Sequence, residues 1–162
     1  MSERVDTLLT KGLAEGYVGA KKPDIVVRSD FAGKANDFVT PVGDHYHDEW
    51  FADDNGGGQE LVLVGDEIGT RVYAGGVILV EELSQLGLTT KDVISRLITS
   101  VNELGGKTRL HEPCSLDLPD GWHYEYTILR RSVEVPLTVG YESISLNGRE
   151  LFAHSHSISP IK

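Results

Sequence analysis

The chain has few of the features that usually reveal a protein's compartment or chemistry. It contains one cysteine, Cys114, so an internal disulfide framework is excluded. No apolar run approaches the roughly 20 residues that a membrane-spanning helix needs. The charged residues at the start lack the apolar segment of a secretion signal. These absences predict a cytoplasmic protein that has no contact with a membrane.

Basic residues are also scarce, because 15 lysines and arginines stand against 25 acidic residues, a net charge of −10. A surface of this sign repels phosphate backbones, so we expect no nucleic-acid partner. The same acidity suits a basic protein partner, as in an immunity-type inhibitor of a basic toxin.

A chain of 162 residues is long enough to bury roughly 68–70% of the surface of its unfolded form. We therefore expect a single domain over residues 1–162, with an N-terminal helix and arm over about 1–40 and a body over about 41–162. Such a core needs no metal or cofactor to stay folded, and none is expected on that ground.

Apolar residues recur at helical spacing in two segments, which predicts helices over residues 3–15 and 89–104. Thr89 and Asp92 form a candidate capping box before the second helix, and Gly105 marks its end. Alternating patterns predict strands over residues 44–52, 58–64, 70–74, 122–128, 141–146 and 149–154.

Two turns organise these strands. Asn147-Gly148 predicts a two-residue hairpin of type I′, and residues 65–69 predict another hairpin loop. The triple glycine at 56–58 is interpreted as a flexible hairpin tip. The fold class predicted is α+β: a curved, mostly antiparallel sheet packed on one long helix, with a short N-terminal helix closing one end.

Several motifs occur in an order that resembles a known domain family. They are Tyr46 to Phe51, Gly57 to Val62 and Arg71 to Ile78, followed by Gly140 to Ile144 and Asn147 to Phe152 with a late His156. Together they resemble an uncharacterised bacterial and archaeal domain family, whose members stand alone or follow helix-turn-helix regulators. The match spans residues 44–157. The resemblance implies the fold class and carries no established activity.

Two His-x-His tracts, His45 with His47 and His154 with His156, are the strongest chemical lead. Residues two apart on a strand point to the same face, so each tract places two imidazoles side by side. If the tracts converge, they hold a divalent metal such as Zn²⁺, with Glu49 as a further ligand. The alternative is that all four are hydrogen-bonded residues at strand ends.

Two glutamates are candidates for acid–base catalysis. Glu60 lies beside the triple glycine and Glu142 beside Tyr141, and burial in an aromatic pocket would raise the pKa of either carboxyl group. Both can equally be cross-strand partners. Five aromatic residues are candidates for the lining of a ligand pocket, or else for the core: Trp50, Tyr73, Trp122, Tyr124 and Tyr126.

No acid, base and nucleophile stand together as a unit in the sequence. We therefore favour a ligand- or protein-binding module over an enzyme. The alternative is a small metal-dependent or acid–base enzyme that uses the paired histidines. Exposed edge strands would also allow a homodimer through sheet pairing.

Overall fold

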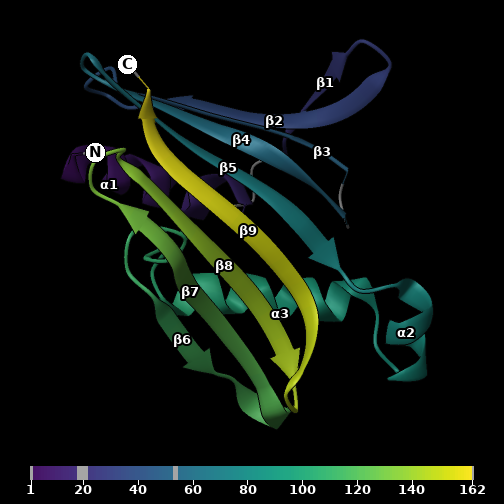
Figure 1. The fold of residues 1–162 in the computed structure, drawn as a ribbon. Coiled ribbons are helices and arrows are strands. Elements are labelled where there is room, and N and C mark those ends of the chain that lie inside the picture. Colours follow the sequence, from purple (N-terminus) through teal and green to yellow (C-terminus); the bar gives the residue numbers. More distant parts are fainter. Residues whose placement is uncertain (1, 18–21, 53–54, 162) are drawn as a thin grey trace.

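The computed structural model describes residues 2–17, 22–52 and 55–161, and a curved, fully antiparallel sheet dominates it (Figure 1). The sheet has nine strands in the spatial order β1-β2-β3-β4-β5-β9-β8-β7-β6. The strands are β1 (Asp24–Arg28), β2 (Phe31–Val39), β3 (His45–Phe51), β4 (Asn55–Val64), β5 (Glu67–Val77), β6 (Cys114–Asp117), β7 (Trp122–Ser132), β8 (Leu137–Leu146) and β9 (Arg149–Ile161).

The two longer helices lie on one face of this sheet, behind it in the view of Figure 1, and a shorter helix lies beside the sheet. They are α1 (Glu3–Gly12), which continues as a π-helical turn, η1 (Leu13–Tyr17), and α2 (Val80–Gln85) and α3 (Thr90–Glu103). A short 3₁₀ turn, η2 (Pro119–Gly121), leads into β7. We call the helix-bearing side the covered face and the opposite side the open face.

Each long helix has its own apolar cluster against the sheet. The first cluster joins α1 to β3, β4 and β9, and its buried members are Val5, Leu8, Leu9, Tyr46, Val62, Val64 and Ile158. The second joins α3 to the other half of the sheet, with Val93, Leu97, Val101, Tyr124, Tyr126, Ile144 and Phe152 among its members. The apolar spacing of each helix therefore matches the face that it buries.

The predicted starting signal of α3 is confirmed. The Thr89 side chain accepts a hydrogen bond from the backbone of Asp92, and the Asp92 carboxylate accepts one from the backbone of Thr89. Two of the donors left free at a helix start are satisfied in this way. The Asn147-Gly148 hairpin is confirmed too, since both residues have the positive φ that a type I′ turn requires.

The same connectivity occurs twice. A helix precedes a meander in each half: α1 precedes β1-β2-β3-β4-β5, and α3 precedes β6-β7-β8-β9. The last strands of the two meanders, β5 and β9, pair antiparallel at the centre of the sheet. The molecule is therefore one continuous sheet made of two similarly wound halves.

The predicted architecture of a sheet packed on one long helix is wrong. The nine-stranded sheet is the main body, and the 14-residue α3 covers only one half of it. The N-terminal helix does not close an end; it lies against β3, β4 and β5. Strand β2 was not predicted, because Phe31–Val39 has no clean polar–apolar alternation.

The triple glycine is also placed differently from the prediction. Gly56, Gly57 and Gly58 lie inside β4, paired with Gly75, Ala74 and Tyr73 of β5, and form no hairpin tip. Ladder hydrogen bonds in a wide sheet hold glycines extended, which composition alone does not indicate. No helix among the described residues is long and apolar enough to cross a membrane.

Candidate functional site

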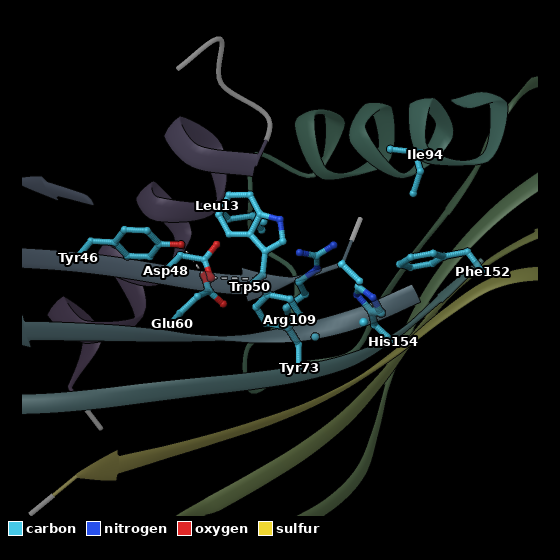
Figure 2. A pocket seen from close by; sticks show the side chains of 13 residues that line it. Leu13, Tyr46, Asp48, Trp50, Glu60, Tyr73, Ile94, Arg109, Phe152 and His154 are labelled. Atoms are coloured by element: carbon cyan, nitrogen blue, oxygen red, sulfur yellow. Dashed lines mark hydrogen bonds between the residues drawn. The ribbon is translucent and has the colours of Figure 1, made fainter. Parts of the chain in front are cut away.

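A cavity of about 70 Å³ lies between the covered face and the helices, and Figure 2 shows the side chains around it. Charged and aromatic side chains line it together. The lining residues are Leu13, Tyr46, Asp48, Trp50, Ala52, Gly56, Gly57, Glu60, Tyr73, Ile94, Arg109, Phe152 and His154. They come from α1's π-helical extension, four strands, α3 and the loop after α3.

Glycines occupy the sheet beside this cavity. On the covered face, Gly56 of β4 pairs with Gly75 of β5, which in turn pairs with His154 of β9. Neither glycine fills the space above the sheet. A Cβ atom on Gly75 would press against the ring of His154, and the φ of +148° at Gly75 disfavours any other residue. The two glycines therefore permit a close approach of neighbouring backbone segments beside the cavity.

Asp48 is the cavity's unusual acid. Its carboxylate is buried and accepts a hydrogen bond of 3.0 Å from the hydroxyl of Tyr73. Burial, followed by repulsion from Glu60, raises the pKa of Asp48 to about 7. This carboxyl group is thus close to half ionised at neutral pH, which suits it to exchange a proton or to bind a polar group.

Glu60 behaves differently, because Arg71 lies beside it. Two nitrogens of the Arg71 guanidinium, Nε and Nη2, donate hydrogen bonds to the Glu60 carboxylate, and the Tyr46 hydroxyl donates to it at 2.8 Å. Burial acts to raise the pKa of Glu60, but the charge and hydrogen bonds of Arg71 outweigh it, so the pKa lies below its usual value. Glu60 is therefore the buried counter-ion of Arg71.

Arg109 and Glu142 form a second buried pair nearby. Arg109 Nε donates to Glu142 Oε1 at 2.8 Å, and the Tyr124 hydroxyl donates to the same oxygen at 2.7 Å. The two halves are linked here, since Arg71 Nη1 donates to the carbonyl of Arg109 at 3.0 Å. Burial opposes ionisation of Glu142, but Arg109 keeps its pKa well below the usual range.

His154 and His156 stand beside Glu142 on the covered face. His154 pairs directly with Glu142 across the β8–β9 ladder, and His156 Nε2 lies 3.5 Å from Glu142 Oε2. Burial lowers the pKa of His156, and burial together with the charge of Arg109 lowers that of His154 to about 3. The His154 imidazole is therefore neutral in ordinary buffers.

The two His-x-His tracts do not converge. His45 and His47 alternate along β3 with the buried Tyr46 and Asp48, so they point to the open face. There His47 Nδ1 lies 2.7 Å from Asp37 Oδ1. The predicted four-histidine arrangement is therefore not present. His45 and His47 lie on the open face of the sheet, whereas His154 and His156 lie on the covered face.

The two glutamates predicted as acid–base residues do not have the expected pKa shift. Glu60 and Glu142 are both buried, but arginines lower their pKa where the sequence analysis expected a rise. The raised pKa belongs to Asp48, which sequence reasoning missed although it shares a strand face with Tyr46 and Trp50. Its position between two aromatic residues at even spacing was the available signal.

Of the five aromatic candidates, two line the cavity and three do not. Trp50 and Tyr73 are lining residues. Trp122, Tyr124 and Tyr126 instead belong to the core under α3, which was the alternative interpretation.

Comparisons with models of protein families, with curated proteins and with solved structures found no match to this chain. The resemblance of residues 44–157 to an uncharacterised domain family therefore stays a prediction.

Proposed function

We propose that the protein is a binding module that takes a small molecule into the cavity beside Asp48. The observation that carries the proposal is the meeting of aromatic rings with a half-ionised carboxyl group in one opening. Trp50, Tyr73 and Phe152 supply apolar and aromatic surface, while Asp48 and His154 supply hydrogen-bonding groups. Ligand sites commonly combine apolar walls with a few polar groups in this way.

The size of the cavity limits the ligand. At about 70 Å³ it is far below the roughly 300–1,000 Å³ of pockets for drug-sized molecules. We infer a ligand of about one ring, with a hydrogen-bonding group that meets Asp48. A cationic or neutral group is favoured over an anionic one, because Asp48 carries negative charge above about pH 7 and the whole chain carries −10.

Three probes of one shape test this proposal: benzamide, benzamidine and benzoate, which are neutral, cationic and anionic. Amide chemical shifts recorded by NMR during titration locate each binding site. We expect benzamide and benzamidine to shift the amides of β3, β4 and β5 around the cavity, with benzoate the weakest. Benzamidine binding should strengthen as the pH rises from about 6 to 8, because Asp48 ionises over this range.

A matched pair of variants on β3 provides the control. Trp50→Leu removes an aromatic ring from the cavity and should weaken benzamide binding roughly 3- to 10-fold. Phe51→Leu makes a similar change on the open face and should leave binding unchanged. The proposal is wrong if all three probes leave the cavity amides unmoved, or if Phe51→Leu has the larger effect.

A further inference from the structure

A cluster of three potential metal ligands lies at the centre of the covered face, next to the cavity. Glu142 of β8 and His154 and His156 of β9 present one donor atom each, and these atoms all lie within 4.8 Å of one another. The β8–β9 register fixes this arrangement, since His154 is directly opposite Glu142 and His156 follows on the same face. Neighbouring strands thus hold the three donors.

The donor atoms of this cluster lack hydrogen-bond partners among the described residues. Glu142 Oε2, His154 Nδ1 and both ring nitrogens of His156 are buried with no hydrogen bond of ordinary geometry, and Glu142 Oε2 and His156 Nε2 make an ion-pair contact at 3.5 Å. Glu142 is fully buried and His156 is 1% exposed. Buried polar atoms are nearly always satisfied by protein, water or an ion, so this group of atoms has the capacity to bind a further species.

The carboxylate of the cluster is already oriented. Tyr124 and Arg109 both donate to Glu142 Oε1, which leaves Oε2 directed at His156 from 3.5 Å. Two atoms that bind one zinc ion in tetrahedral geometry, each at about 2.0–2.1 Å, lie roughly 3.3–3.4 Å apart. Glu142 and His156 are close to that spacing. Outer partners of this kind fix ligand orientation in metal sites.

We propose that Glu142, His154 and His156 bind one divalent first-row transition-metal ion, with its remaining positions open towards the cavity. Two imidazoles and one carboxylate are the protein ligands of several zinc enzymes and of mononuclear iron(II) sites. His154 also lines the cavity, so a small molecule there can reach the ion. Arg109 carries a positive charge beside the site, which weakens the binding of any cation.

The metal alone tests this proposal, on untagged protein that has been treated with a chelator. Co²⁺ serves as a spectroscopic probe because its visible absorption reports coordination by protein ligands, and Zn²⁺ is titrated by calorimetry. We expect one ion per chain. His156→Gln should lower the affinity for both ions at least tenfold, and circular dichroism shows whether this variant folds. His154→Gln, at a half-buried position, should give the same loss if His156→Gln does not fold.

The control variant is His47→Gln on the open face, where His45, His47 and Asp37 form an exposed cluster. It should leave Co²⁺ absorption and Zn²⁺ affinity unchanged. If wild-type protein binds neither ion, or if His47→Gln abolishes binding while His156→Gln and His154→Gln do not, the proposal is overturned.

The metal site and the proposed ligand cavity are separable by experiment. Trp50→Leu should leave Co²⁺ absorption intact, and His156→Gln should leave benzamide binding intact. Wild-type protein that binds benzamide but neither metal ion would overturn the metal site alone, and wild-type protein that binds a metal ion but none of the three probes would overturn the binding function alone.

Discussion

Two arginines lie in the interior, and each one holds a carboxylate that also accepts a hydrogen bond from a tyrosine. Arg71 has no exposed surface and Arg109 is 6% exposed. Charges at such depth are tolerated because each is paired and hydrogen-bonded. Removing one partner leaves the other charge buried alone, which costs more than the intact pair contributes.

Arg71→Met should therefore lower the free energy of unfolding by roughly 3–5 kcal/mol, because Glu60 loses its counter-ion. Denaturant titration measures this change. The double variant Arg71→Met/Glu60→Leu should regain part of the loss, since no unpaired charge remains.

Arg131→Met is the comparison for this prediction. Arg131 pairs with Glu112 at 3.1 Å on the surface, where an ion pair contributes at most about 1 kcal/mol. Equal losses for Arg71→Met and Arg131→Met would contradict the role given to the buried pair.

Asp48 makes stability depend on pH in the opposite direction to most acids. Its pKa is raised from an ordinary 3.8 to about 7, so the folded protein holds a proton that the unfolded chain has released. The stability that this bound proton contributes is fully present below about pH 4, and it is lost as the pH rises through about 7.

Asp48→Asn removes this dependence, while its amide oxygen still accepts the hydrogen bond from Tyr73. The stability difference between the variant and wild type should shift in favour of the variant by roughly 1–3 kcal/mol between about pH 5 and pH 8. Denaturant titrations at both pH values measure it. Asp66→Asn, in the exposed β4–β5 turn, should show no such shift; a flat difference for Asp48→Asn would refute the assignment.

At the scale of elements, the strands beside the cavity carry paired glycines. Gly56 pairs with Gly75, which pairs with His154, and a Cβ atom on either glycine would collide with a backbone carbonyl oxygen of a neighbouring segment. The sequence shows these glycines but not their pairing, because pairing is a property of two strands. A prediction from one segment therefore treated the triple glycine at 56–58 as a hairpin tip.

Strand β1 is the second element that supports a prediction, which concerns pairing with another copy of the chain. It is one of the two edge strands of the described sheet, and Ile25 and Val27 are 69% and 62% exposed. A second copy paired antiparallel about Val26 would set Ile25 against Val27 and Asp24 against Arg28 on each side. Apolar and oppositely charged cross-strand pairs both stabilise a sheet, so the strand is complementary to itself.

We expect a homodimer through this edge, seen as a concentration-dependent mass in analytical ultracentrifugation. Val27→Lys places lysines on the shared edge and should shift the equilibrium to monomer. Val72→Lys, at an exposed position of β5 on the open face, is the matched control and should not. Monomer at every concentration for wild type would contradict the prediction.

At the scale of the whole molecule, the two halves share an internal chemistry as well as a connectivity. Tyr46 donates to Glu60 as Tyr124 donates to Glu142, and in both cases the tyrosine lies opposite the residue two positions after the glutamate. The partner arginine differs, because Arg71 comes from the adjacent strand and Arg109 from a loop. On the strand next to Glu142, the residue directly opposite is therefore His154, whereas the residue opposite Glu60 is Arg71.

Local patterns in the sequence were sufficient for α3, its capping box, the Asn147-Gly148 hairpin and most strands, because each depends on residues close together in the chain. Only tertiary structure decided the order of the strands, the face on which each histidine tract lies and the arginine that meets each glutamate. Those outcomes depend on strand register, where a shift of one residue exchanges the two faces of a sheet. The same register brings His154 and His156 to Glu142 and carries His45 and His47 away from them.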